Sequence, residues 1–222
     1  MTAMSSYSVE EITAEELARI TPVAEGLAGQ VRALVDATVR TEVDADAVAE
    51  AREHIAAATE ILRRRQLDGA FGVRFSEAAG KRNWGNAVCG VRNPIAPPLD
   101  MSYDGEKLTG TAHMGAAYEG PAGLVHGGMI AAMLDQALGS AAESAGAPGM
   151  TGTLTIRYRQ GTRLGPITVS AWLDRVEGVK SFAKGTVSTA DGVTVEAEGV
   201  FILPRWARGE VREAMIRAVG EG

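Results

Sequence analysis

The sequence predicts an α+β fold in which an antiparallel sheet curls around one long apolar helix, with a helical extension in front. Three observations lead to this fold class. A nearly all-apolar helix is expected over about 126–145, strand-like alternation follows it to about 203, and an Ala-rich amphipathic segment fills 1–68. A sheet that curls around the helix buries it well, because a helix that is apolar nearly all round is normally buried.

Residues 1–68 are predicted to form the helical extension. Thr13-Ala14-Glu15-Glu16 has the form of a capping box and opens a short first helix. Thr21 followed by Pro22 fits the start of a second, longer helix, since proline is favoured at the first helical position. Asp44 is placed to cap a third helix. The two long helices are amphipathic, so we expect a helical hairpin that lies on the main domain or on a partner subunit.

The remaining chain divides into three further parts. Residues 69–98 are expected to be an ordered loop that leads into the core, because aromatic residues seldom sit in flexible tethers. Residues 99–205 form the main domain: a hairpin with its turn at Asp104-Gly105, the central helix, and then an antiparallel meander of four long strands. Residues 206–222 are expected to form a C-terminal helix.

The central helix carries the most informative pattern. A glycine-rich approach leads into His126-Gly127-Gly128, and an apolar helix follows. Asp135 is the first charge on that helix and stands alone until Glu143. A lone carboxylate on a buried helix is costly unless it is paired or used.

Composition narrows the function classes. The formal net charge of -6 and the absence of a long Lys/Arg run argue against a nucleic-acid surface. One cysteine excludes an internal disulfide framework and a cysteine-based zinc site. No apolar run approaches the roughly 20 residues of a membrane span, and the N-terminus lacks the features of a signal peptide. We therefore expect a cytoplasmic protein without a membrane span.

The remaining chemistry-bearing residues are scattered. The three histidines, His54, His113 and His126, do not form a ligand cluster, so no metal is expected. His54 is interpreted as a surface or boundary residue and His113 as a packing residue in a strand. Cys89 is not favoured as a nucleophile, because no histidine is near it in sequence.

The phrase Gly-Pro-Ala-Gly-Leu-Val-His-Gly-Gly over 120–128, followed by Asp135, resembles the hotdog-fold thioesterases. It is most similar to the PaaI-like branch, which includes the mammalian mitochondrial thioesterase superfamily members. The order of elements fits the same family, and the resemblance covers roughly 87–205. The segment Cys89-Gly90-Val91-Arg92-Asn93-Pro94 is similar to a Cys-Gly-x-x-Asn-Pro motif of many relatives. Residues 1–68 have no counterpart in the minimal family domain.

The resemblance implies hydrolysis of acyl-coenzyme A (acyl-CoA) thioesters to free acid and CoA, with CoA as part of the substrate and no other cofactor. Asp135 matches the catalytic carboxylate of the family. Gly127, with His126 and Gly128, matches the oxyanion-binding turn. Thr151 matches a hydroxyl residue that assists in the mitochondrial relatives.

The chemistry is consistent with those residues. Free N–H groups at a helix N-terminus can stabilise the negative charge on the thioester oxygen, and a carboxylate can act as general base or as nucleophile. The sequence does not choose between these two roles. Gly127 and Asp135 lie eight residues apart, which is about 12 Å along one helix. We therefore expect a homodimer, or a higher homo-oligomer such as a tetramer, in which two subunits share each site.

Two rival functions remain. One is a hotdog protein that binds or senses acyl-CoA without turnover, which Asp135 argues against. Structural interpretations of the three site residues also remain open. In these, His126 is a simple helix cap, Asp135 is a satisfied structural carboxylate and Thr151 is an ordinary strand residue. The other is a hotdog hydratase or dehydratase, whose Asp/His arrangement is not found. Arg157, Arg159 and Lys180 are candidates to meet the CoA phosphates, and the acyl chain length is left open.

Overall fold

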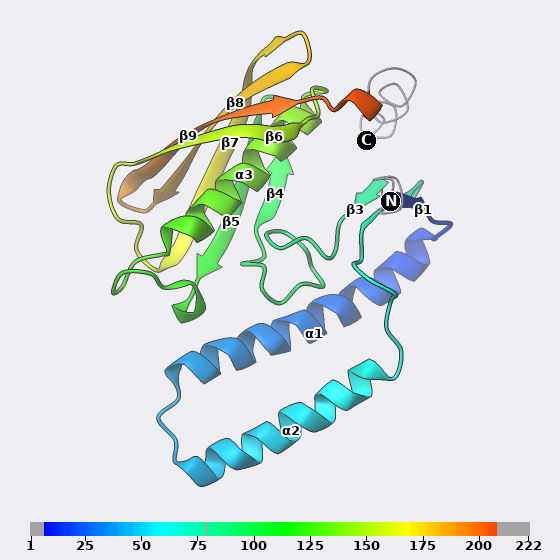
Figure 1. Ribbon diagram of the computed structural model, residues 1–222, viewed down its shortest axis with the longest axis vertical. Helices are drawn as coiled ribbons and strands as arrows, with labels where there is room; N and C mark the ends of the chain where they lie inside the picture. Colours follow the sequence, from blue (N-terminus) through cyan, green and yellow to red (C-terminus); the bar gives the residue numbers. More distant parts are fainter. Residues whose placement is uncertain (1–6, 79, 208–222) are drawn as a thin grey trace.

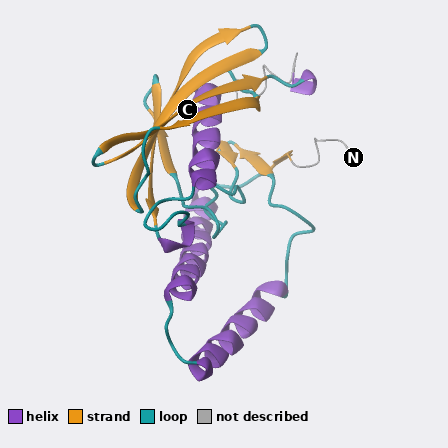
Figure 2. Cartoon of the chain, turned by 60° about the vertical axis from the view of Figure 1, so that its left-hand side comes forward, coloured by secondary structure: helices purple, strands orange, loops and turns teal. Residues whose placement is uncertain are grey.

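The computed structural model describes residues 7–78 and 80–207 (Figure 1). Its main unit is a six-stranded antiparallel sheet in the order β4-β5-β7-β8-β9-β6. The strands are β4 (Asp100–Tyr103), β5 (Lys107–Met114), β6 (Met150–Tyr158), β7 (Gly165–Glu177), β8 (Lys180–Thr189) and β9 (Gly192–Ile202). Helix α3 (Gly127–Ser144) lies across the concave side of this sheet (Figure 2). The predicted α+β class, a curled sheet around a central helix, is confirmed.

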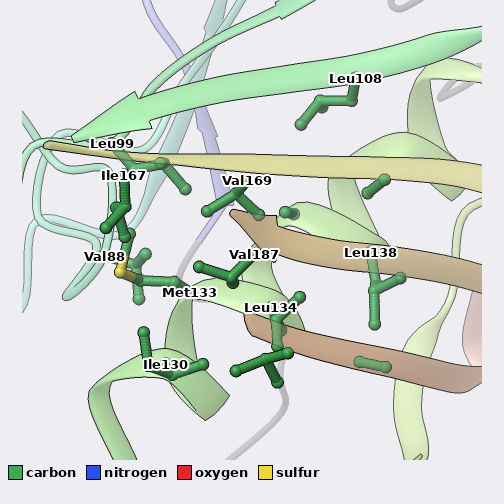
Figure 3. Packing of buried hydrophobic residues seen from close by; sticks show 14 of the residues in the cluster. Val88, Leu99, Leu108, Ile130, Met133, Leu134, Leu138, Ile167, Val169 and Val187 are labelled. Carbon is green, nitrogen blue, oxygen red and sulfur yellow. The ribbon is translucent and has the colours of Figure 1, made fainter. Parts of the chain in front are cut away.

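The core lies between one face of α3 and the sheet. Ile130, Met133, Leu134 and Leu138 are buried on the helix, and they meet alternate residues of the central strands such as Val169 (Figure 3). Burying a side chain of this size contributes about 1.5–3 kcal/mol relative to leaving it exposed. Because only one face of α3 packs on the sheet of its own chain, the opposite face is left for other contacts.

The strand order corrects one prediction. The four strands after α3 were expected to pair in succession, but β6 pairs with β9 at the edge of the sheet and β7 lies in the middle, between β5 and β8. Tight turns at Gly178 (φ 60°) and Gly192 (φ 115°) do join β7, β8 and β9. Residues 159–164 form no two-residue turn between β6 and β7, so nothing local holds those two strands together. The meander therefore has three strands.

A second correction concerns the first helix. The capping box at Thr13 is present, but α1 (Ala14–Arg40) runs through Pro22 without a break. The Thr21 hydroxyl donates to the Leu17 carbonyl at 2.8 Å instead of capping a new helix. Proline removes one helical hydrogen bond, and the rest of this long helix continues in spite of that loss. Asp44 caps α2 (Ala45–Arg63) as predicted.

The helical extension contacts the main domain through α1, whose Ala28 is buried, and α1 approaches the short 3-10 turn η2 (Ala116–Tyr118). Helix α2 has no buried residue and lies on the outside (Figure 1). No helix in the described part of the chain is long and apolar enough to cross a membrane.

A small sheet was not predicted. It has the order β1-β2-β3 and consists of β1 (Tyr7–Val9), β2 (Val73–Ser76) and β3 (Gly80–Arg82). Two of its strands lie in the stretch 69–98, which was expected to be only a loop. β1, which precedes α1 in the chain, pairs in parallel with β2, which follows α2. This long-range contact is not revealed by local sequence patterns. The predicted boundaries at 68, 98 and 205 stay predictions. The C-terminal helix was predicted over 206–222, and residues 208–222 lie outside the residues that the structure describes.

Candidate active site

Asp135 and Thr151 meet directly. The Thr151 hydroxyl donates to Asp135 Oδ1 at 2.7 Å. Asp135 lies on α3, and Thr151 lies near the start of β6, beside an irregularity in its pairing with β9 between Thr151 and Thr153. One hydroxyl therefore orients the carboxylate, and no hydrogen bond to Asp135 Oδ2 is found among the described residues. Both side chains are partly open to solvent, so the carboxylate is accessible to a ligand.

Asp135 opens into a cavity of about 340 Å³. The face of α3 that points away from the core lines it with Gln136, Gly139 and Glu143. Residues 148–151, the end of β9 and two residues of the small sheet complete the wall. Gln136 is held in place, because its Oε1 accepts from Asn86 Nδ2 at 2.8 Å and its Nε2 donates to Ser140 at 2.9 Å. The cavity is therefore built on the side of α3 that the sheet leaves uncovered.

The turn at the start of α3 is a second candidate site. His126 is the N-cap residue, and its Nδ1 accepts from the Gly128 N–H at 3.0 Å. The His126 carbonyl accepts from the N–H groups of Met129 and Ile130. Among the described contacts, no partner is found for the Gly127 N–H. The Gly127 N–H is thus the donor that remains for a ligand, whereas that of Gly128 is engaged by the imidazole.

Neighbouring residues hold this turn in shape. The Tyr158 hydroxyl donates to the Gly127 carbonyl at 2.7 Å. Gly120 packs so closely on His126 that an added Cβ would lie 2.7 Å from its Cα. Gly123 has a φ of 74°, which favours glycine. These constraints explain the glycines in the approach to the helix. Tyr158 is a residue that sequence reasoning missed, because a tyrosine at the end of a strand gives no sign of its polar partner.

The two candidate sites lie at different places on α3. Gly127 is its first residue and Asp135 is eight residues on, a separation of about 12 Å along the axis. The residues that line the Asp135 cavity do not include His126, Gly127 or Gly128. One chain therefore holds the carboxylate with its hydroxyl, and the N–H turn, at two separate places.

The scattered candidates are not brought to this site. His54 is exposed near Glu50, at 3.9 Å. His113, expected to pack, is exposed and lines a different cavity beside Arg32 and Arg40 of α1, so that interpretation is wrong. No group of three His, Cys, Asp or Glu suited to hold a metal ion occurs in the described part of the chain.

Cys89 lies in the loop that precedes β4. The Asn83 side chain donates to its sulfur at 3.5 Å. Burial raises the pKa of the Cys89 thiol above its usual value, outweighing the smaller effects of Asn83 and Lys81. A thiol with a raised pKa is a poorer nucleophile at neutral pH, because less of it is thiolate.

The predicted phosphate contacts have partners within the sheet. Arg157 pairs with Glu198 at 3.1 Å, and Arg159 pairs with Glu196 at 2.7 Å, each across the β6–β9 boundary. A CoA phosphate would compete with these carboxylates for either arginine. Their role toward CoA, and that of Lys180, stays a prediction.

Comparison with known proteins identifies the family. The model of the thioesterase superfamily matches residues 122–196, which include the turn, Asp135 and Thr151. A crystal structure described as a thioesterase superfamily protein aligns with a TM-score of 0.72 and 31% identity, over 81% of this chain and 94% of that one. The chain belongs to the thioesterase superfamily.

Curated relatives in this superfamily are similar over a shorter stretch. The chain is 38% identical over 101 residues to acyl-coenzyme A thioesterase THEM4 of Bos taurus, which is 44% of this chain and 41% of that protein. It is 36% identical over 101 residues to the protein of the same name from Mus musculus, covering 44% of each. The chain spans less than half the length of these relatives. Assignment to the PaaI-like branch and to the cytoplasm stays a prediction.

Proposed function

We propose that this thioesterase superfamily protein hydrolyses acyl-CoA thioesters to the free acid and CoA. The observation that carries the proposal is the Asp135–Thr151 pair at 2.7 Å, in which an accessible carboxylate has one oriented oxygen and one without a described partner. A carboxylate positioned in this way can activate water or attack a carbonyl carbon. The names of the curated relatives give the substrate class, and the matched domain contains both residues.

In the general-base route, Asp135 accepts a proton from water while the water oxygen attacks the thioester carbonyl carbon. In the nucleophile route, the Asp135 oxygen itself attacks, and water then hydrolyses the mixed anhydride. Both routes place a negative charge on the former carbonyl oxygen, and both expel CoA as its thiolate. The Gly127 N–H, at the positive end of α3, is the proposed donor to that oxygen.

We infer that each site is shared between two copies of the chain. The roughly 12 Å between Gly127 and Asp135 along α3 is too great for both to contact one carbonyl group. β6 is an edge strand, with Met150 and Tyr158 about half exposed at its two ends (52% and 53%). An unpaired edge is a template for a second strand, and a two-fold arrangement of two such edges gives two equivalent sites.

Complementation between two inactive variants tests this function and its shared site. Asp135→Ala removes the carboxylate, and Gly127→Pro removes the N–H. In a heterodimer of the two, one of the two shared sites keeps both groups. We expect each homodimer to be inactive and the purified heterodimer to recover up to half of the wild-type activity, measured as CoA release with a thiol reagent. No recovery in verified heterodimers would refute the shared site, and no hydrolysis by wild type would refute the function.

The second candidate is acyl-CoA binding without turnover. The same hydrogen bond favours it in one respect, because a carboxylate that accepts from Thr151 can be a satisfied structural group. Saturable binding of a non-hydrolysable acyl-CoA analogue, without CoA release from acyl-CoA esters of several chain lengths, would establish this function instead.

A further inference from the structure

The cavity beside Asp135 extends along α3 toward the C-terminal end of the helix. Asp135, Gly139 and Glu143 line it at four-residue spacing, which places them on one face. Its volume of about 340 Å³ lies at the low end of the range of about 300–1,000 Å³ for small-molecule pockets. A group bound at Asp135 therefore has space of small-molecule size, and part of that space lies along the face of α3 that carries Glu143.

A charged pair lines the cavity eight residues along α3 from Asp135. Lys81 Nζ donates to both carboxylate oxygens of Glu143, at 2.6 and 2.5 Å. The Lys81 side chain is 33% exposed and that of Glu143 is 26% exposed, so the pair is partly desolvated. Lys81 belongs to β3, outside the residues 122–196 that match the family model. Part of the cavity lining thus comes from a segment that precedes the matched domain.

The small sheet holds Lys81 firmly. Phe75 and Lys81 are cross-strand partners, so they share one face of the sheet, and both line the cavity. Arg74 and Arg82, the adjacent pair, take the other face, where the Glu10 carboxylate accepts a hydrogen bond from each. Two like charges directly opposite each other repel, and Glu10 compensates them. β3 is therefore anchored on the face that carries Arg82, while Lys81 lines the cavity from the other face.

The charges of the cavity favour the acyl group over CoA. The charged residues among those that line it are Lys81, Asp135 and Glu143, and with all three ionised they sum to one negative charge. Phosphate groups are disfavoured in such a field. The apolar part of the lining includes Phe75, Met150 and Phe201. Of the two parts of an acyl-CoA, the acyl chain is the one that suits this cavity.

We propose that the Lys81–Glu143 pair is the end wall of the acyl pocket and that it restricts the enzyme to short acyl groups; this rests on the proposed hydrolysis at Asp135. Asp135 and Glu143 lie about 12 Å apart along the helix. Contacts of about 3.5–4.0 Å at each end leave roughly 4–5 Å. An extended chain gains about 1.2 Å per bond, since a three-bond residue spans about 3.6 Å. About four bonds fit, which corresponds to an acyl group of about five carbons.

An acyl chain of more than about five carbons must displace the Lys81–Glu143 pair or press its methylene groups against it. Either change leaves the two charged side chains less well solvated. A single methylene that does not fit is worth on the order of 10- to 200-fold in kcat/KM. We therefore expect kcat/KM of the wild type to fall at least tenfold from hexanoyl-CoA to decanoyl-CoA.

The test is the double variant Lys81→Met/Glu143→Gln, which removes both charges at nearly constant size. Its matched control is Lys184→Met/Asp174→Asn, which removes an ion pair of 2.8 Å on β7 and β8 that does not line the cavity. For each protein, kcat/KM is measured with butanoyl-, hexanoyl-, decanoyl- and hexadecanoyl-CoA. The proposal expects the ratio of decanoyl- to butanoyl-CoA to rise at least tenfold in the double variant and to stay unchanged in the control.

A second variant keeps the test decisive if the double variant does not fold. Gly139 lies midway along the cavity, and a Cβ there would lie 3.2 Å from Phe201 Cε1. Gly139→Ala suits a helix and narrows the pocket, so the ratio of hexanoyl- to butanoyl-CoA should fall severalfold. An unchanged length preference in every folded cavity variant would overturn the wall while leaving the hydrolysis intact. An equal loss at all chain lengths would overturn it too, and absence of wild-type hydrolysis would refute the proposed function and the wall together.

Discussion

Replacement of Gly127 by proline isolates the contribution of one backbone N–H group. Gly127 is the first helical residue of α3, a position where proline is favoured because its missing N–H has no partner within the helix. The preceding residue must be extended, and His126 is, with φ of -60° and ψ of 130°. Gly127→Pro should therefore leave the helix intact while removing the proposed donor to the oxyanion.

The expected loss follows from the role of that donor. Removing one oxyanion-hole donor typically lowers kcat by about 10²–10³-fold, or about 2.7–4 kcal/mol. The stability of the fold should change little, since exchanging glycine for proline in a compatible conformation stabilises by about 0.4–1 kcal/mol through the unfolded chain. Activity and stability should therefore separate.

Gly127→Ala is the matched control. It keeps the N–H and adds the same Cβ, which would lie 3.3 Å from the Tyr158 hydroxyl. Its kcat should remain within a few-fold of the wild-type value. The assay is kcat with hexanoyl-CoA by CoA release, alongside thermal unfolding followed by circular dichroism. A proline variant with wild-type kcat would refute the role of the N–H, and equal losses in both variants would attribute the effect to crowding at Tyr158.

Three further outcomes are expected. Thr151→Val should lower kcat by about tenfold, because a hydrogen bond to a charged group contributes about 1.5–3 kcal/mol and the exposure of this one reduces its effect. Thr151→Ser should restore the rate. A valine variant with the full rate would contradict the role of the 2.7 Å contact. Glu10→Gln should lower the free energy of unfolding in urea by about 2–3 kcal/mol. This is less than the roughly 3–5 kcal/mol lost when a fully buried ion pair is broken, because Arg82 is 5% exposed but Glu10 is 27% exposed. An unchanged unfolding midpoint would show that the two arginines do not need the carboxylate. Cys89 should react slowly with a thiol reagent at pH 8 in the folded protein and fast after unfolding, because burial raises the pKa of its thiol. Equal reaction rates in both states would refute the raised pKa.

The fold was predictable to the extent that it depends on local pattern. The apolar helix with His126 as N-cap, the capping box at Thr13 and the hairpin turn at Gly105 each follow from residues close in sequence. The alternating strands also predict a sheet with one buried face. These features need only propensity, periodicity and caps.

What failed depends on distant parts of the chain. The place of β6 beside β9 is a choice of partner that alternation does not specify, because every strand offers two edges. The small sheet needs Glu10 between Arg74 and Arg82, residues that are more than 60 positions away. The pair of Lys81 and Glu143 spans a similar distance. In the candidate site, Asp135, Thr151 and the turn were predicted from the resemblance, whereas the Lys81–Glu143 pair that lines the cavity was not.

The separation of the carboxylate from the N–H turn has a physical reason within α3. Carboxylates are among the best partners for free N–H groups at a helix N-terminus. An aspartate within one turn of Gly127 would accept that N–H itself and remove it from the reaction. His126 takes the neighbouring N–H of Gly128 but leaves that of Gly127 without a described partner. At about 12 Å along the helix, Asp135 cannot pair with its own turn, so both groups stay available and meet only across a substrate in the proposed dimer.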